Sequence, residues 1–414
     1  MCAQRAKWTG VLSGFSVWLL LLAAMPLSAG DMTGNCRLGN QPAATLLIPY
    51  FEVDLANPNG QTTLVSVNNS APRPTLARMV LWTDWGVPTL AFDIYLTGYD
   101  IQTLNLRDVF NGNLPQTGPS ISPSGPLSQA GPGFAGCSGS AADTRPATGP
   151  EIQSSLRAAH TGRPIPNSQP AQCAASARPK STLVVGYITV DVVNRCTGTS
   201  VMSTANTPAD PAYFAKGGTG LASDVNVLWG DVFFHDPQLN QAMSQPAITV
   251  LADPQFFNPG DYTFYGRYSG FDSRDDRMPL SSMYYVRFFN GGSFAGGTDL
   301  LVWRDNRSPE AGALPCGSVP SWAAPGEEQL LVFDEQENAA ALSKPSAFPF
   351  ATQRVKVGGR TIPTQPSSGW LMLDLWHADG THAQGWVGSL LSTSGRFSSG
   401  HEAMRADDLC NFGP

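Results

Sequence analysis

Apolar residues occur along this chain in short runs rich in Val, Ile, Thr, Tyr, Phe and Trp, and Gly, Pro, Asn or Asp bound almost every run. Runs of this kind predict β-strands. In the first part of the chain they predict strands at residues 46–54, 62–68, 76–84, 90–96 and 101–109. The segment Phe92-Asp93-Ile94-Tyr95-Leu96 alternates an apolar with a mixed face, as in a half-buried strand. No long amphipathic helix is evident, and the best short candidate is residues 151–160.

The composition agrees with an all-β fold and narrows the range of partners. Hydrophobic residues make up 42% of the chain, enough for real cores, whereas charged residues make up only 14%. The 42 glycines and 34 prolines do not suit long helices or coiled coils. The formal net charge of −7 argues against a nucleic-acid-binding protein and against docking onto anionic lipid.

The first 29 residues are typical of a cleaved signal peptide. Arg5 and Lys7 supply the positive region, an apolar run spans residues 11–25, and Ala29 is a small residue suited to cleavage. The run is short for a bilayer, so an uncleaved anchor is the lesser alternative. No later stretch approaches 18 uncharged apolar residues. We therefore expect export to the periplasm or the cell exterior, with no membrane span in the mature chain.

Cysteine usage predicts disulfides. An even number of cysteines in an exported chain predicts up to three bridges, and the absence of Cys-x-x-Cys disfavours a zinc knuckle. The six cysteines after the leader are Cys36, Cys137, Cys173, Cys196, Cys316 and Cys410. We expect Cys137–Cys173, since both lie in one insertion, and less strongly Cys316–Cys410, since both lie in the second half. Cys36–Cys196 is the pair that remains.

The chain divides into two halves with similar strand order. Residues 111–180 are crowded with Gly, Pro, Ser, Ala and Gln, and we read them as an insertion with too few apolar residues to offset its ordering entropy. The matching segments are 48–53 with 283–289, 62–68 with 298–303, 79–84 with 330–334, 186–192 with 369–375 and, more weakly, 248–253 with 402–407. The common order predicts an internal duplication, with domain one at residues 30–255 and domain two at 256–414. Two unrelated β domains are the alternative.

About seven strands per half, with turns rich in Pro and Gly, predict two antiparallel β-sandwiches, and a closed barrel is the runner-up. With its start at Leu47-Ile-Pro-Tyr-Phe-Glu-Val53, the chain resembles uncharacterised exported bacterial proteins with paired immunoglobulin-like domains. The resemblance implies a fold and an export route, and it implies no activity.

One predicted hairpin carries the candidate metal ligands. Asp379-Gly380 stands between two apolar runs, and both positions of a two-residue turn favour φ > 0. If the strand residues are paired outward from this turn, His377 lies opposite His382, at a Cα separation of about 4.5 Å. Two imidazoles at that spacing can share a metal, although a structural zinc site requires four ligands. Two polar residues at a hairpin tip are the simpler interpretation.

Two acidic loops, residues 272–277 and 334–338, make calcium possible but unsupported, and no other cofactor is expected. In the first loop Arg274 and Arg277 would neutralise the carboxylates, so a solvated, self-paired loop is favoured. The Gly-rich segments 216–220 and 291–297 lack the spacing of a phosphate-binding loop.

No catalytic signature is visible. Neighbouring residues on a strand point to opposite faces, so His235-Asp236 and His401-Glu402 are not oriented pairs by themselves. A spatial Ser–His–Asp set stays open, because triads are not local in sequence. Trp82 and Trp85 lie three apart, which predicts one ring in the core and the other exposed on a turn.

These features favour a secreted or periplasmic, non-enzymatic protein that binds an extracellular protein or glycan or forms part of a surface structure, as an adhesin does. The first alternative is a carbohydrate-binding protein that uses exposed aromatic rings. The second is an extracellular hydrolase with two facing carboxylates in a cleft.

Overall fold

The computed structural model of the chain describes residues 41–137, 149–177, 182–258, 260–270, 274–341, 347–364, 366–395 and 397–406. The predicted leader, Cys36 and Cys410 lie outside the described residues. Over the described ranges the protein is all-β, with several antiparallel sheets and a few short helices. None of the helices described is long and apolar enough to cross a membrane.

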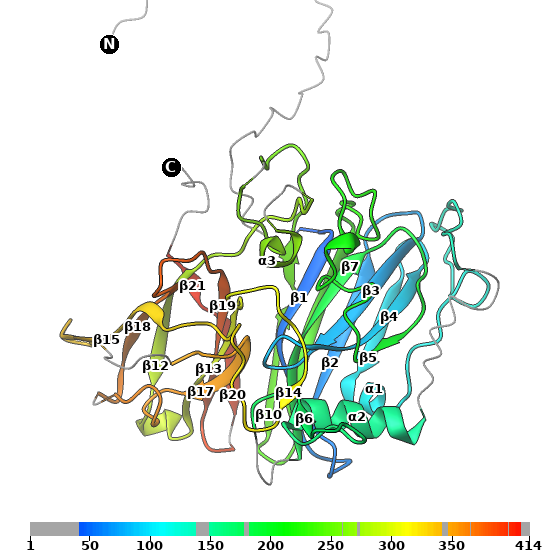
Figure 1. The fold of residues 1–414 in the computed structure, drawn as a ribbon. Helices are drawn as coiled ribbons and strands as arrows, with labels where there is room; N and C mark the ends of the chain where they lie inside the picture. The colour runs from blue at the N-terminus through cyan, green and yellow to red at the C-terminus, as the bar shows by residue number, and fades with distance from the viewer. Residues whose placement is uncertain are drawn as a thin grey trace, which may run out of the picture. The chain divides into compact units, whose positions relative to one another are not determined.

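Strands between residues 45 and 250 form two sheets around one apolar core (Figure 1). The larger sheet has the order β11-β1-β7-β3-β4-β8 and the smaller sheet the order β10-β9-β2-β5. We call this pair of sheets the first sandwich. Its strands are β1 Thr45–Asp54, β2 Thr62–Asn69, β3 Thr75–Trp82, β4 Pro88–Leu96, β5 Ile101–Asn105, β7 Leu183–Val192, β8 Ser200–Val201, β9 Leu228–Asp236, β10 Gln241–Pro246 and β11 Ile248–Val250.

Strands between residues 283 and 405 form the second sandwich, around a separate core. Its larger sheet has the order β16-β15-β18-β12-β21 and its smaller sheet the order β17-β13-β19-β20. The strands are β12 Met283–Phe289, β13 Gly297–Arg304, β15 Glu327–Asp334, β16 Ala339–Ala341, β17 Thr352–Lys356, β18 Ser368–His377, β19 Gly385–Ser392, β20 Ser398–Glu402 and β21 Met404–Arg405.

The two sandwiches have the same strand order. In the larger sheets, the strands of the first sandwich correspond in order to those of the second: β11, β1, β7, β3 and β4 to β21, β12, β18, β15 and β16. In the smaller sheets, the correspondence is β10, β9, β2 and β5 to β20, β19, β13 and β17. Residues 186–192 and 369–375 occupy the same central position, so the predicted common strand order is confirmed. In the described residues the sheets keep open edges, which excludes the closed barrel there.

The same residue pairs mark the register of both halves. Phe51 on β1 lies opposite Gly186 on β7, and Phe288 on β12 lies opposite Gly369 on β18. A hydroxyl gives a second marker, because Thr63 Oγ1 donates to Glu52 O at 3.0 Å and Thr298 Oγ1 donates to Phe289 O at 2.9 Å. Each residue of one sandwich can therefore be assigned its counterpart in the other.

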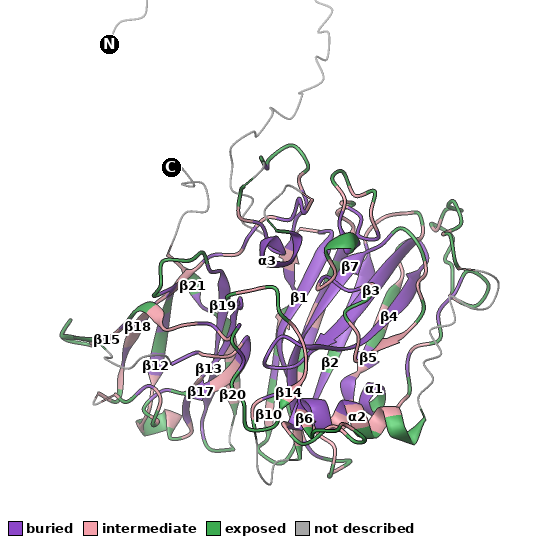
Figure 2. Cartoon of the chain, in the orientation of Figure 1, coloured by how far each residue is buried: buried purple, intermediate pink, exposed green. Residues whose placement is uncertain are grey.

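The two larger sheets differ in what covers their outer faces. Every residue of β7 after Leu183 is buried, whereas buried and partly exposed residues alternate along β18 (Figure 2). Over β7, the outer face packs against the smaller sheet of the second sandwich, the loop that contains Tyr213 and Phe214, and the linker that contains Phe264 and Tyr265. The predicted half-buried character of residues 92–96 is wrong, since β4 is buried on both faces: Phe134 of the insertion packs edge-on against Tyr95, and the amides of Thr197 and Gly198 donate to Asp93.

Three short helices interrupt the strands: α1 Leu106–Phe110, α2 Pro150–Thr161 and α3 Gly266–Ser269. The weak helix candidate at residues 151–160 is confirmed as α2, which begins with Pro150 at its first turn and ends before Gly162 in a left-handed conformation. α2 buries Leu156 and Ala159, so this part of the insertion does contribute to packing, contrary to expectation. The strand predicted at 101–109 ends at Asn105, whose side chain caps α1 by accepting from the Arg107 amide.

The predicted hairpin at Asp379-Gly380 does not form. β18 pairs with β15 and β12, whereas β19 pairs with β13 and β20, so the connection passes from one sheet to the other. A tight turn is present, with Gly380 at φ 78° and its amide donating to His377 O. The position of a turn was thus predicted correctly, but not its type, since Gly380 has a positive φ and Asp379 does not, and a turn does not fix which strands pair.

Two disulfides join distant segments, and their pairing differs from the prediction. Cys137 bonds Cys196, and Cys173 bonds Cys316, with Cα separations of 5.1 Å and 4.9 Å. The pairs Cys137–Cys173, Cys316–Cys410 and Cys36–Cys196 are therefore wrong. The prediction relied on proximity in sequence, but the two cysteines of the insertion lie beside different segments of the chain, which contain Cys196 and Cys316. Beside the second bridge, β6 Gln172–Cys173 pairs with β14 Leu314–Pro315.

Candidate functional site

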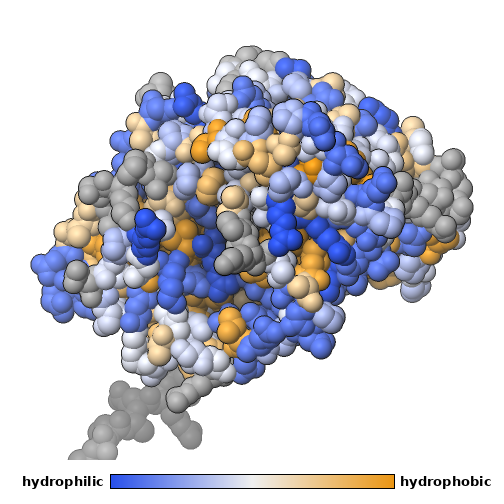
Figure 3. Space-filling view, turned by 60° about the horizontal axis from the view of Figure 1, so that its bottom comes forward, coloured by the Kyte–Doolittle hydropathy of each residue, from blue (hydrophilic) through white to orange (hydrophobic). Residues whose placement is uncertain are grey.

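A cleft of about 830 Å³ opens between the two sandwiches. Figure 3 shows a hollow on the underside of the molecule, with hydrophilic and hydrophobic side chains around it. One wall comes from β1 and β7, and the opposite wall from β13 and β17. The rim comes from residues 173–177 and 317–320, which the Cys173–Cys316 bridge ties together.

Arg354 on β17 connects the two walls. Its Nη1 lies 2.6 Å from Glu52 Oε1 on β1, and its Nη2 lies 2.7 Å from Asp299 Oδ2 on β13. The hydroxyl of Tyr50 donates to the other oxygen of Glu52 at 2.6 Å. Burial alone would lower the pKa of Arg354, but Glu52 and Asp299 outweigh it and raise that pKa above its usual value.

Two residues that line the cleft, Trp85 and Gln353, each carry a hydrogen-bond donor without a protein acceptor in the described part of the chain. The indole Nε1 of Trp85 and the amide Nε2 of Gln353 are shielded from solvent and have no hydrogen-bond partner among the described residues. Trp85 as a whole is only 5% exposed. Because both nitrogens are shielded from solvent beside an open cleft, they lie within its walls, and a ligand in the cleft reaches them only if these side chains reorient.

The charges that line the cleft cancel. Glu52 and Asp299 oppose Arg354 and Lys356, and the remaining lining residues are aromatic, aliphatic or uncharged polar groups. Lys356 Nζ donates to the backbone carbonyl of Gly296. A cleft with this balance suits a neutral, polar ligand better than an ion.

The cleft does not have the geometry of a glycoside hydrolase. Such an enzyme places the scissile bond between two carboxyl groups. Here the guanidinium of Arg354 occupies the space between Glu52 and Asp299. The two acids are thus arranged to hold an arginine across the domain interface rather than to act as an acid–base pair.

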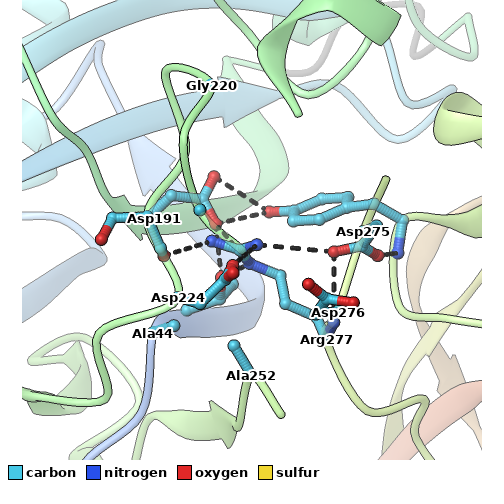
Figure 4. Close-up of polar contacts among 12 residues, drawn as sticks. Ala44, Asp191, Gly220, Asp224, Ala252, Asp275, Asp276 and Arg277 are labelled. Carbon is cyan, nitrogen blue, oxygen red and sulfur yellow. Dashed lines mark hydrogen bonds and ion pairs between the residues drawn. The ribbon is translucent and has the colours of Figure 1, made fainter. Parts of the chain in front are cut away.

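A second polar cluster is buried above the larger sheet of the first sandwich, around Arg277 (Figure 4). Its guanidinium lies 3.6 Å from Asp191 Oδ1, 3.6 Å from Asp224 Oδ1 and 3.4 Å from Asp275 Oδ1. Thr45 on β1 accepts from Arg277 Nε at 2.5 Å. These contacts hold the linker onto β1, β7 and the loop before β9.

Burial governs the titration of this cluster. It raises the pKa of Asp191 and of Asp275, although Arg277 opposes the rise in both cases. The pKa of Asp224 is raised to about 6, first by burial, with Arg277 opposing and Asp276 adding to the rise. The loop predicted to be solvated is thus buried from Asp275 to Arg277, although its self-pairing is present.

No group of three or more metal-ligating side chains occurs in the described residues, including around Arg277. In the Gly-rich segment 216–220, the amide of Gly217 donates to Asp276 Oδ2 at 3.2 Å, so this loop binds a carboxylate of the same chain. At the other acidic loop, Asp334 accepts from the amides of Gln336 and Asn338. Both contacts are those of ordinary loop structure.

The two candidate metal ligands do not face each other across a hairpin. His377 is buried, and its Nδ1 lies 2.8 Å from Thr381 Oγ1 while its Nε2 lies 3.4 Å from Asp305 O. Burial and then Arg304 lower the pKa of His377 to about 4. His382 packs its ring against Tyr262 and Trp376. Metal binding by His377 and His382 stays a prediction, without the cross-strand pairing on which it depended.

The remaining histidines and tryptophans considered in the sequence analysis lie on strands or in the core. His401 on β20 contacts Ser389 Oγ at 3.0 Å, but Ser389 is buried, and no carboxylate contact to this ring is present among the described residues. His235 is exposed on β9. Trp82 and Trp85 are both buried, so the prediction that one of the two rings is exposed is wrong, because Cys173, Ala174 and Trp322 cover Trp85.

Sequence reasoning did not select Glu52, Asp299 or Arg354. One signal was present, since Glu52 stands in the apolar strand Leu-Leu-Ile-Pro-Tyr-Phe-Glu-Val and a charged residue there needs a partner when both faces are covered. Its partner is 302 positions away, and no local pattern identifies it.

No family model matches the chain, and no curated protein or solved structure matches it. The geometry of the cleft therefore carries the functional argument.

Proposed function

We propose that the protein is a non-catalytic binding protein of the periplasm or cell exterior, and that the cleft between the sandwiches binds a neutral oligosaccharide. The observation that carries the proposal is a wide cleft between the two sandwiches whose lining charges cancel, with aromatic and uncharged polar residues along its walls. Sugar hydroxyls are neutral and supply many acceptor oxygens. A volume of about 830 Å³ is in the range of sites that enclose a ligand of several rings.

The position of the cleft supports binding rather than catalysis. Small-molecule sites occur preferentially at domain interfaces, where two rigid bodies contribute walls. In this protein β-strands carry Tyr50, Glu52, Asp299 and Arg354, and a disulfide stiffens the rim. A preorganised cleft of this kind lowers the entropic cost of binding.

The proposal also includes export and a finer description of the fold. Each pair of sheets would be one immunoglobulin-like domain, the two would descend from one duplicated domain, and residues 1–29 would be a cleaved leader. The repeated strand order supports the duplication. The two disulfides support an oxidising compartment, because such bonds rarely persist in the cytosol.

A glycan array with the exported chain, followed by calorimetry on each hit, tests the proposal. The variant Gln353→Ala should weaken binding about tenfold, equivalent to about 1.4 kcal/mol, because it removes a polar side chain from the wall of the cleft. Gln238→Ala is the matched control, since Gln238 is exposed in the β9–β10 turn, and its affinity should equal that of the wild type.

Three results would contradict the proposal. The first is an array with no hits, and the second is equal affinity of the Gln353→Ala variant and the wild type. The third is the release of new reducing ends from a bound glycan, which would show that the protein is a hydrolase rather than a binding protein.

A further inference from the structure

The contact between the two sandwiches joins unlike faces. The outer face of the larger sheet of the first sandwich packs against the outer face of the smaller sheet of the second. On the first side, Trp82 stacks on Tyr187 with ring centroids 5.7 Å apart. On the second side, Trp303 meets the ring of Tyr187 edge-on at 6.0 Å, and Trp386 lies in the same cluster.

Because the sandwiches repeat, each face has a counterpart elsewhere in the chain. The Phe–Gly register assigns Trp82 and Tyr187 to Phe333 and Trp370 on the larger sheet of the second sandwich. Those two rings are stacked as well, with centroids 3.8 Å apart and an interplanar angle of 3°. The aromatic stack that docks within the chain is thus present a second time.

The smaller sheets correspond in the same way. Thr63 and Thr298 occupy equivalent positions, so Asn68 corresponds to Trp303. Asn68 pairs with Trp229, and Trp303 pairs with Trp386, which makes Trp229 the counterpart of the docked Trp386. By the same register Phe233 is the counterpart of Leu390.

These second faces are open to solvent. Trp386 and Leu390 are 1% and 7% exposed, whereas Trp229 and Phe233 are 41% and 44% exposed. On the other counterpart face, Tyr285 is 38% exposed. Exposed aromatic groups on a flat sheet face mark interaction surfaces. A groove of about 580 Å³, lined in part by Trp229, Phe233 and Pro246, crosses the first of these faces.

We propose that these two faces dock onto each other between copies of this chain, head to tail. The face of β9 with Trp229 and Phe233 would receive the face of β12 and β18 with Tyr285 and Trp370 from a second copy. The contact between copies would repeat the contact between the sandwiches inside each chain, with each strand replaced by its counterpart from the other sandwich. This inference does not depend on what the cleft binds.

A second copy is the occupant that the structure favours, because the chain already contains the matching surface. The internal contact shows that the outer faces of a larger and a smaller sheet fit each other. A contact between unlike faces leaves one face of each kind free at the two ends, so it continues into an open filament or closes into a ring. A surface structure assembled from one exported protein is the expected product.

Complementary variants test the proposal. Trp229→Asp disables one face and Trp370→Asp the other, and a charge in the contact disfavours docking. Sedimentation should show the wild-type exported chain growing beyond dimers with concentration and each variant as a monomer. An equimolar mixture of the two variants retains one good face of each kind, so it should form dimers and nothing larger. Leu127→Asp, at a residue 74% exposed in the insertion, is the control that should assemble like the wild type.

Phe233→Asp and Tyr285→Asp form a second complementary pair, to be used if either tryptophan variant loses its cooperative thermal transition. A wild-type chain that stays monomeric throughout the concentration series would overturn the proposal. A mixture of variants that fails to dimerise would also overturn it, because head-to-tail docking requires that pair. Glycan binding that depends on Trp229 in a monomeric wild type would assign the face to a sugar instead.

Discussion

The ring of Phe51 lies against Gly186 on the neighbouring strand, so closely that a Cβ at Gly186 would be 2.8 Å from the Phe51 Cζ atom. The same contact recurs between Phe288 and Gly369, where the added Cβ would be 3.1 Å from the ring. A glycine leaves room for an aromatic ring from the next strand to cover the backbone. This pair fixes the register of β1 on β7 and of β12 on β18.

Replacing Gly186 by alanine should destabilise the protein by about 3 kcal/mol, because the added methyl would also lie 2.1 Å from the carbonyl oxygen of Trp82. Gly369→Ala should cost a similar amount, since it would meet Phe333 O at 2.0 Å. Urea denaturation gives the free energies of unfolding. Gly133→Ala is the control, as nothing lies within 4 Å of its added carbon. Equal stability of the two variants and the control would contradict the assigned register.

Replacing Arg354 by methionine should destabilise the protein by about 3 kcal/mol, because Glu52 would be left as a buried charge without its partner. Arg287→Met is the matched control. Arg287 pairs with Glu335 at 2.9 Å, but the two side chains are 60% and 47% exposed. An exposed pair contributes little, so this variant should stay within about 1 kcal/mol of the wild type. Equal losses in both variants would argue against the buried contact across the cleft.

The titration of Asp224 should lower the free energy of unfolding as the pH rises from about 4 to 6. The pKa of Asp224 is about 6 in the folded protein, against 3.8 in an unstructured chain, so the folded state holds the proton more tightly. Above pH 6 the folded protein bears the cost of a buried charge, whereas below pH 4 the group is neutral in both states. The free energy of unfolding of Asp224→Asn should therefore equal that of the wild type near pH 4 and exceed it by about 1 to 2 kcal/mol at pH 8, since solvent screens part of the charge. Parallel stability profiles of the two proteins would refute this assignment.

Peptide mapping without reduction should recover Cys137 linked to Cys196 and Cys173 linked to Cys316. Replacing Cys173 and Cys316 together by alanine should cost about 5 kcal/mol in the chain-entropy model, since 143 positions separate them. The same variant should weaken ligand binding, because the bridge ties two rim segments of the cleft. Recovery of a Cys137–Cys173 peptide would favour the pairing expected from the sequence.

Local sequence patterns were informative where the structure depends on local chemistry. The runs of β-branched and aromatic residues located most strands, and the common order of those runs in the two halves appears in the sheets. The turn at Gly380 was also correctly located. Strand propensity and turn geometry involve neighbouring residues, and they are therefore visible in a short window of sequence.

Patterns failed where the answer depended on partners distant in the chain. The Asp-Gly turn did not show that β18 and β19 belong to different sheets, and sequence proximity gave the wrong cysteine pairs. The prediction that either Trp82 or Trp85 is exposed failed because Trp322, more than two hundred positions later, covers the ring of Trp85. Nor could any local pattern place Arg354 between Glu52 and Asp299.

The sequence by itself determined that the chain forms β-strands in two similar sets, with cysteines suited to an oxidising compartment. Only the tertiary structure decided which faces are covered. A period of two along a strand tells which side chains share a face, but not whether water or another sheet lies against it. Equivalent positions such as Trp229 and Trp386 are both tryptophan, yet one is exposed and the other buried, because the outer face of β19 packs against the first sandwich, whereas the outer face of β9 is left uncovered by the described residues.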